Sequence, residues 1–253
     1  MSNINPKIPN GSWIMSSKNY KVENGFLICE CKNIKGEYIK NKVKIKDNCN
    51  FDNINGKLVK KYLLEPHLSK NDKKMFYKYL DKANVYFEYG SGGSTYQASI
   101  KNNIKKIYSV ESDIKWQNKL KKIIKNNNIT YIFNNMDTRP NTWGNPGKNA
   151  TNAQKINYSN HIVKLSKEEQ DKIDLVLIDG RFRVACCLKC YDIIKKDCII
   201  AFDDFLNRPQ YHIVLDYFDI IEKTKDNRMV IIKKKNNVSV PKNIIEKYEL
   251  IKI

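Results

Sequence analysis

Short apolar runs alternate along the chain with segments whose apolar residues recur at helical spacing. The apolar runs predict five strands, at residues 84–89, 106–111, 129–133, 173–179 and 198–204. The segments between and after them predict helices at residues 91–102, 112–127, 183–196 and 208–221. Continuous apolar strands joined through helices are typical of a parallel sheet covered on both faces. The pattern therefore predicts an α/β fold with a doubly wound, mostly parallel sheet, and a late run at 229–234 predicts an antiparallel edge strand.

The first sixty residues have a different pattern. Glycine and asparagine punctuate short alternating runs, which predict β hairpins. A leading helix follows at about residues 60–83, with Ser69 as its N-cap. We therefore expect a small all-β module at residues 1–59 and a larger α/β domain at residues 60–253. A loop rich in Asn, Pro and Gly at 134–153 has a length typical of lids and substrate loops.

The composition, with 41% hydrophobic and 29% charged residues, is that of a globular protein. No apolar run approaches the roughly 18 residues of a membrane span, and the first residues contain no apolar segment of a signal peptide. We therefore expect a cytoplasmic protein with no membrane partner. The formal charge of +19 favours nucleic acid as a partner. The lysines are spread along the whole chain, however, so nucleic acid is not the favoured partner.

Seven cysteines occur in the chain, and four of them stand at positions 186, 187, 190 and 198. Cys187 and Cys190 form a CxxC pair within an apolar segment predicted to be a buried helix. No second CxxC or histidine partner follows at zinc spacing. The cysteines are therefore expected to be reduced thiols of the core.

The glycine-rich turn FEYGSGGST, at residues 87–95, follows the first predicted strand and opens a helix. Such a turn lets backbone N–H groups approach a ligand closely. It lacks the Lys of a triphosphate-binding loop, and Thr95 stands where a dinucleotide fingerprint has its third glycine. A carboxylate beside the turn, Glu88, suits the sulfonium and amino groups of S-adenosylmethionine. The expected cofactor contacts here are Glu88, Gly90, Ser91, Gly92, Gly93, Ser94 and Thr95.

A second acid stands at the end of the second strand, where a ribose hydroxyl acceptor is expected. Glu111 lies 21 residues after Gly90, close to the spacing of about 20 that this geometry requires. With the E-x-G-x-G-G turn, it makes residues 62–233 resemble the class I S-adenosylmethionine-dependent methyltransferases. The resemblance implies a Rossmann-like fold and methyltransferase activity. It also implies cofactor contacts by Ser112 and Asp179, and an adenine contact by Asp137.

Acidic and basic residues gather after the fourth and fifth strands, whose ends lie at the same edge of the sheet. They are Asp179, Arg181, Arg183, Asp203, Asp204, Arg208, Tyr211 and His212. The pattern is similar to that of sugar O-methyltransferases acting on antibiotic glycans. This resemblance implies that Asp179, Asp203 and Asp204 hold Mg²⁺, which would orient two sugar hydroxyls.

One position departs from that family, since Arg181 stands where the family has an acid proposed as the base. Either His212 or Asp204 then takes the proton, or the site does not use a metal. Arg181 and Arg183 could instead clamp an anionic substrate such as a nucleotide sugar. Arg208 and Tyr211 are further candidate substrate contacts.

Residues 10–59 resemble one repeat of the cyanovirin-N homology fold, a mannose-binding lectin family. The shared features are GSW, an L-x-C-x-C strand, Cys49 and an N-x-NGKL ending. That family normally has two repeats, and the partner of the position held by Cys49 is here Ser16 or Ser17. The resemblance implies sugar binding. A module this small should also pack on the larger domain or pair with a second copy, as in a homodimer.

Three functions remain open on the sequence. The first is an S-adenosylmethionine-dependent O-methyltransferase acting on a sugar, either a nucleotide sugar or a glycan. The second is an RNA 2′-O-methyltransferase, which would need a Lys-Asp-Lys-Glu arrangement of which only Asp179 can be placed. The third is a non-catalytic carbohydrate-binding protein. The intact glycine turn and Glu111 favour an enzyme over the third.

Overall fold

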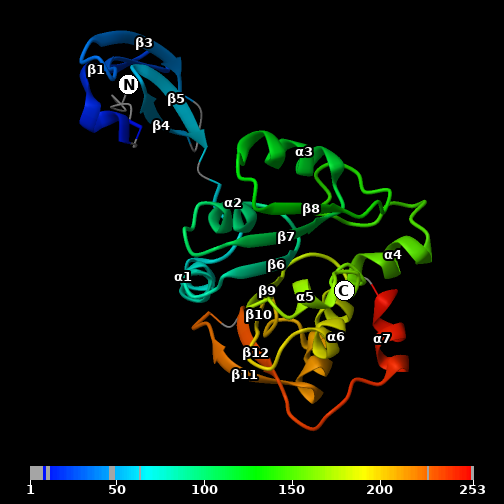
Figure 1. The fold of residues 1–253 in the computed structure, drawn as a ribbon. Coiled ribbons are helices and arrows are strands. Elements are labelled where there is room, and N and C mark those ends of the chain that lie inside the picture. Colours follow the sequence, from blue (N-terminus) through cyan, green and yellow to red (C-terminus); the bar gives the residue numbers. More distant parts are fainter. Residues whose placement is uncertain (1–7, 10–11, 46–48, 63, 227, 252–253) are drawn as a thin grey trace. The chain divides into compact units, whose positions relative to one another are not determined.

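The computed structural model describes residues 8–9, 12–45, 49–62, 64–226 and 228–251. The chain divides into two compact units, Met1–Leu64 and Glu65–Ile253, shortly after the boundary predicted near residue 60 (Figure 1). In the described part of the chain, no helix is long and apolar enough to cross a membrane.

The first unit is a small antiparallel β module. After the 3₁₀ helix η1 (Ser12–Ser16), the strands β1 (Ser17–Glu23), β2 (Phe26–Lys32) and β3 (Tyr38–Lys44) form a sheet in that order. The strands β4 (Cys49–Ile54) and β5 (Lys57–Tyr62) form a separate hairpin. Alternate residues of β2 face a core of Trp13, Leu27, Cys29, Cys31, Phe51 and Leu58. The side chain of Cys49, on which the disulfide comparison rests, lies outside the described residues.

The second unit is built on a seven-stranded sheet of order β11-β12-β10-β9-β6-β7-β8. The strands β6, β7, β8, β9 and β10 run parallel. Their bounds follow the predicted runs closely: β6 is Val85–Tyr89, β7 Lys106–Glu111, β8 Ile129–Phe133, β9 Leu175–Ile178 and β10 Ile199–Phe202. The predicted α/β fold with a mostly parallel sheet is therefore confirmed.

Helices cover both faces of this sheet (Figure 1). They are α1 (Lys70–Leu80), α2 (Gly93–Ser99), α3 (Ile114–Ile123), α4 (Asn152–Ser159), α5 (Lys167–Gln170), α6 (Arg183–Ile193), the 3₁₀ helix η2 (Pro209–Asp216) and α7 (Lys242–Glu249). One hydrophobic cluster joins the sheet to α1 and α2, and a larger one joins it to α4, α6 and η2. Ser69 caps α1 as predicted, since its hydroxyl accepts from the amide of Asp72 at 3.1 Å.

Two predictions for the last elements were wrong: the end of the predicted helix at 208–221 and the edge position of the last strand. Residues 218–221 belong to strand β11 (Phe218–Lys223), not to a helix, and β12 (Val230–Lys234) lies between β10 and β11 rather than at the edge. The apolar residues Val214, Tyr217, Phe218 and Ile221 recur at helical spacing, which explains the error. Because most of β11 is exposed, it lacks the continuous apolar run of a buried strand.

The four neighbouring cysteines lie in the larger core cluster, as predicted. Cys186, Cys187, Cys190 and Cys198 are fully buried, and burial raises the pKa of each thiol above its ordinary value. They are therefore protonated and contribute packing.

Candidate cofactor and active site

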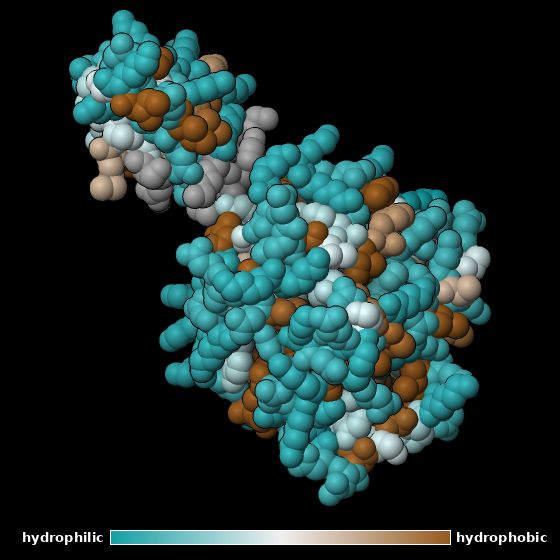
Figure 2. All heavy atoms as spheres, viewed as in Figure 1, coloured by the Kyte–Doolittle hydropathy of each residue, from teal (hydrophilic) through white to brown (hydrophobic). Residues whose placement is uncertain are grey.

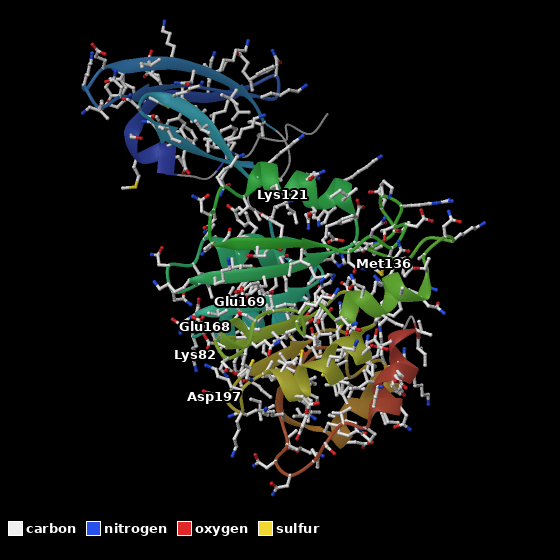
Figure 3. The ribbon with its side chains drawn as sticks, turned by 45° about the vertical axis from the view of Figure 1, so that its right-hand side comes forward. Lys82, Lys121, Met136, Glu168, Glu169 and Asp197 are labelled. Carbon is white, nitrogen blue, oxygen red and sulfur yellow. The ribbon has the colours of Figure 1, made fainter. Side chains whose placement is uncertain are left out.

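A cavity of about 720 Å³ opens in the second unit at the carboxyl ends of β6, β7, β9 and β10. Figure 3 places Met136, which follows β8, at the opposite end of the sheet from Lys82, Glu168, Glu169 and Asp197, which precede the strands. The carboxyl end is where open α/β sheets bind ligands. The cavity is lined by Glu65, Pro66, His67, Gly90, Ser91, Gly92, Gly93, Ser94, Glu111, Ser112, Asp113, Trp116, Asn141, Trp143, Gly144, Tyr158, Asp179, Gly180, Arg181, Arg183, Asp203, Asp204, Arg208 and Arg228.

The glycines of the turn after β6 differ in what they contact. Gly90 has a φ of +97°, and a Cβ there would lie 3.0 Å from the amide nitrogen of Gly180. A Cβ on Gly93 would lie 2.1 Å from the backbone carbon of Glu65. These two positions therefore require glycine for packing within the protein. A Cβ on Gly92 would meet no protein atom within 4 Å. Gly92 lines the cavity, so the space that a side chain would fill there is open to a ligand.

Glu88 does not line the cavity, contrary to its predicted contact with the cofactor. It is fully buried, and it accepts hydrogen bonds from the hydroxyls of Tyr86 (2.8 Å), Ser94 (2.6 Å), Thr95 and Ser109 (2.6 Å). Burial raises the pKa of Glu88, and these four donors oppose the rise. Two of the donors belong to the first turn of α2, so Glu88 fixes the glycine turn from behind. Thr95 is also outside the cavity lining.

The other side of the turn is held by a residue that the sequence did not single out. The indole Nε1 of Trp116 donates to the carbonyl of Ser91 at 2.9 Å, and both residues line the cavity. The hydroxyl of Ser91 lies 2.5 Å from that of Ser109. The turn is thus fixed by hydrogen bonds from three segments before any ligand binds, which lowers the ordering cost of binding.

Glu111 lies where the sequence predicted a ribose acceptor. It ends β7, is 6% exposed and lines the cavity. Its Oε1 accepts from the backbone amides of Ser112 (2.6 Å) and Asp113 (2.8 Å), which fixes the orientation of the carboxylate. Burial raises the pKa of Glu111 to about 7, although these amides oppose the rise. An ionised carboxylate in this place can accept hydrogen bonds from the two hydroxyls of a ribose.

We expect the affinity for S-adenosylmethionine to depend on pH through Glu111. The cofactor's hydroxyls need the ionised acid as acceptor, and the pKa of Glu111 lies at about 7 in the protein. Affinity should therefore rise with pH through this range and be about tenfold weaker at pH 6 than at pH 8. Titration calorimetry at several pH values measures it. The Glu111→Gln variant should bind more weakly with no such pH dependence, and an equally steep profile in this variant would assign the effect to another group.

The long loop between β8 and α4 forms one wall of the cavity through Asn141, Trp143 and Gly144. Trp143 is 70% exposed and has a φ of +55°, which is uncommon for a bulky residue. Its carbonyl accepts from Nε of Arg181 at 2.8 Å, and the carbonyl of Gly144 accepts from the hydroxyl of Ser112 at 3.1 Å. These two bonds attach the loop to the ends of β7 and β9.

Asp137 does not line the cavity, so its predicted adenine contact is not supported. Its carboxylate Oδ2 accepts from the amide of Asn149 at 3.1 Å, and its backbone is packed against Gly147. Asp137 therefore stabilises the loop that carries Trp143. The aromatic residues Trp116 and Trp143 line the cavity instead.

At the other end of the cavity, Arg183 joins the ends of β9 and β10. Its side chain is 6% exposed, and Nη2 donates to Oδ1 of Asp179 at 2.9 Å. Nη1 donates to the backbone carbonyl of Asp203 at 2.7 Å and lies 3.4 Å from Oδ2 of Asp204. Arg183 therefore neutralises the acidic cluster and connects two strand ends, rather than acting as a free substrate clamp.

Two further arginines bind Asp204. Nη2 of Arg208 donates to Oδ2 at 2.8 Å, and Nη2 of Arg228 donates to Oδ1 at 2.6 Å. Burial alone would raise the pKa of Asp204, but the hydrogen bond from Arg228 and the charges of Arg183 and Arg208 hold it below its ordinary value. Asp204 is therefore a fully paired carboxylate, unsuited to the predicted role of taking a proton.

Asp179 and Asp203 are the less completely paired acids of the cluster. Burial and the neighbouring charges of Asp179 and Asp204 raise the pKa of Asp203 to about 8, so this group is protonated at neutral pH. Burial also raises the pKa of Asp179, against the opposing charge of Arg183. The side chain of Asp179 is 26% exposed, compared with 3% for Asp203 and 11% for Asp204. Asp179 is the most accessible carboxylate of the three.

These residues do not fit the predicted Mg²⁺ site. Both oxygens of Asp204 accept from guanidinium groups, Asp179 is paired with Arg183, and Oδ2 of Asp203 lies 3.7 Å from Nη1 of Arg183. A divalent cation would have to displace or lie beside several fixed positive charges. Among the described residues, no group of three or more His, Cys, Asp or Glu side chains has a metal-binding arrangement. The guanidinium groups around these acids favour a role for the site in binding an anion or in accepting a proton.

His212 and Tyr211 lie outside the cavity lining, contrary to their predicted roles. Nε2 of His212 lies 3.1 Å from the carbonyl of Phe205, an oxygen that can only accept, so this nitrogen carries the proton. Tyr211 is fully buried, and its hydroxyl accepts from Nη1 of Arg208 at 2.9 Å. Tyr211 positions Arg208, which does line the cavity, as does Arg181.

Comparison with known proteins establishes the fold. This chain is similar to a methyltransferase-like protein from Silicibacter pomeroyi, with a TM-score of 0.61 and 22% identity over 73% of this chain and 95% of that one. Two weaker matches are the fibrillarin pre-rRNA processing protein of Methanococcus jannaschii (TM-score 0.44, 13% identity, 86% of this chain and 98% of that one) and an rRNA methylase from Streptococcus thermophilus (TM-score 0.43, 12% identity, 66% and 98%). No family model matches the chain, and no curated protein matches its sequence. Glu65–Ile253 therefore has the Rossmann-like fold found in methyltransferases.

Proposed function

We propose that this protein is an S-adenosylmethionine-dependent O-methyltransferase. The observation that carries the proposal is the single cavity that joins the glycine turn, the fixed carboxylate of Glu111 and the carboxylate of Asp179. Gly92 leaves room for a ligand beside the turn, and Glu111 would accept its ribose hydroxyls. When bound, S-adenosylmethionine would supply a methyl group carried on a sulfonium, which leaves as a neutral thioether.

Asp179 would take the proton from the acceptor hydroxyl. It is the most exposed acid of the cluster, and its raised pKa makes it a stronger base than an ordinary aspartate. Arg183 holds its Oδ1 in place at 2.9 Å, which fixes the direction of the carboxylate. This assignment replaces the sequence-based candidates His212 and Asp204, whose atoms are engaged elsewhere.

The proposed acceptor is a sugar hydroxyl on a molecule that also carries a phosphate or another anion. Arg181, Arg208 and Arg228 line the same cavity as Asp179, and the side chains of Arg208 and Arg228 are 36% and 35% exposed although both pair with Asp204. A planar guanidinium group can donate two parallel hydrogen bonds to a phosphate group. A nucleotide sugar meets both requirements. The 2′-hydroxyl of RNA meets them as well, and it is the second candidate for the same reason.

A screen for methyl transfer tests this proposal. The full chain is incubated with S-adenosylmethionine labelled in its methyl group, and with nucleotide sugars, free neutral glycans or single-stranded RNA. We expect transfer to a phosphate-bearing acceptor and little to neutral glycans. Transfer to neutral glycans alone would contradict the anionic acceptor, whereas cofactor binding without any transfer would contradict the enzymatic role.

For the first unit, sugar binding and pairing of two copies also remain proposals. The cyanovirin-N resemblance supports the former, and the small size of the core around Trp13 and Phe51 supports the latter. Light scattering of the full chain, compared with residues 65–253, would show whether the first unit changes the mass of the particle.

A further inference from the structure

The outer face of the three-stranded sheet in the first unit is rich in lysine. Strand residues alternate between two faces, and Leu27, Cys29 and Cys31 of β2 face the core. Their neighbours on β2 and the residues paired with them in register therefore point away from the core. The outward set comprises Lys18, Lys21, Glu23, Phe26, Ile28, Glu30, Lys32, Tyr38, Lys40, Lys42 and Lys44.

This face, which we call the lysine face, carries a positive charge that its own acids do not balance. It has six lysines and two glutamates. The glutamates are close to β1, where Lys21 lies 3.1 Å from Glu23 and Lys18 lies 3.9 Å from Glu30. In the described part of the chain, Lys40, Lys42 and Lys44 of β3 have no ion pair within 4 Å, and all three are exposed. The side of the first unit that is visible in Figure 2 is mostly hydrophilic, with several hydrophobic residues among the hydrophilic ones.

The three lysines of β3 form a regular row. As alternate residues of one strand, they are about 6.6 Å apart along it. Such a row can contact successive phosphates of an extended chain. The sequence suggested that the lysines were scattered, because their spacing along the chain conceals that three strands bring them onto one face.

Aromatic rings lie among these lysines. Tyr38 is 43% exposed, and Nζ of Lys18 lies 4.0 Å from the centre of its ring. Phe26 lies under Lys42, with Nζ 5.0 Å from the ring centre. An exposed ring beside a row of cations is the combination that sheet surfaces use to bind single-stranded nucleic acid, since bases stack on the ring while lysines contact phosphates.

We propose that the lysine face binds single-stranded nucleic acid. A neutral glycan would leave the row of lysines without a counter-charge, and a rigid duplex would not bring its bases onto Tyr38. The proposal concerns binding by the first unit and does not depend on the cavity's cofactor.

The test is fluorescence anisotropy of the full chain with a labelled 20-nucleotide single-stranded RNA at several salt concentrations. The triple variant Lys40→Ala, Lys42→Ala, Lys44→Ala should bind about tenfold or more weakly. Its plot of log affinity against log salt should be shallower by about 2, since each phosphate contact on a single strand contributes about 0.7. The matched control, with Lys125→Ala, Lys196→Ala and Lys225→Ala, removes the same charge from exposed positions of the second unit.

A second variant separates base stacking from charge alone. Tyr38→Ala should weaken RNA binding by about tenfold, because it removes the ring on which a base stacks, and it should leave the binding of a heparin fragment unchanged. Circular dichroism and thermal melting confirm that each variant is folded. Equal losses in the two triple variants would overturn the proposal, as would equal effects of Tyr38→Ala on RNA and heparin.

Discussion

Replacing Asp179 by Asn should lower the rate of methyl transfer by about 100- to 10,000-fold, the usual contribution of a positioned general base. Asparagine has nearly the same shape, and its carbonyl can still accept from Nη2 of Arg183, as Oδ1 does at 2.9 Å. The variant keeps this hydrogen bond but loses the negative charge of the carboxylate and the ability to take a proton. Single-turnover assays with the best acceptor from the screen would measure the effect on the chemical step.

Two comparisons distinguish this role from a structural one. Cofactor affinity of the Asp179→Asn variant should change little, whereas Glu111→Gln should weaken cofactor binding more than it lowers the maximal rate. The wild-type rate should rise with pH as Asp179 loses its proton, because burial raises the pKa of this acid. Retention of more than about a third of the wild-type rate would show that another group takes the proton.

Arg183→Met should destabilise the second unit by about 3–5 kcal/mol, because it leaves buried carboxylates without their partner. Arg183 is 5% exposed and contacts Asp179, Asp203 and Asp204. Methionine approximates the length of the aliphatic part but supplies no donor. Urea unfolding followed by circular dichroism would measure the change in the free energy of unfolding.

The loss should become smaller as pH falls. Without Arg183, the acids of the cluster have raised pKa values in the folded state, so protonation favours the folded variant below those values. The control is Arg181→Met, since Arg181 is only partly buried and its described hydrogen bond goes to the carbonyl of Trp143 at 2.8 Å. A loss of similar size in the control, or one independent of pH, would contradict this account of Arg183.

The sequence predicted the parallel strands well because each is a continuous apolar run between polar segments. It placed β7 at residues 106–111 and β8 at 129–133, as observed. It did not predict β11, whose exposed residues lack such a run. It also could not show that β12 enters the sheet between β10 and β11, since strand order depends on pairing between distant segments.

The sequence placed the candidate site residues at strand ends, but it could not show which of them face the cavity. Glu88 and Glu111 both lie at strand ends, but one is fully buried behind the turn and the other lines the cavity. Sequence gives the strand on which a residue lies, whereas the neighbouring side chains decide which contacts it makes. The same limit applies to Arg183, which pairs with the acids instead of facing a substrate. Trp116 and Trp143 were missed because they lie in segments without a motif.

The central claim is that the cavity beside Gly92 binds S-adenosylmethionine, and calorimetric titration of the full chain with this cofactor tests it most directly. We predict binding of one molecule per chain. The Gly92→Val variant should bind about 5- to 150-fold more weakly, the equivalent of about 1–3 kcal/mol of overpacking, with an unchanged melting temperature because a Cβ there meets no protein atom within 4 Å. Absence of binding by the wild-type chain, or equal binding by a folded Gly92→Val variant, would contradict the account.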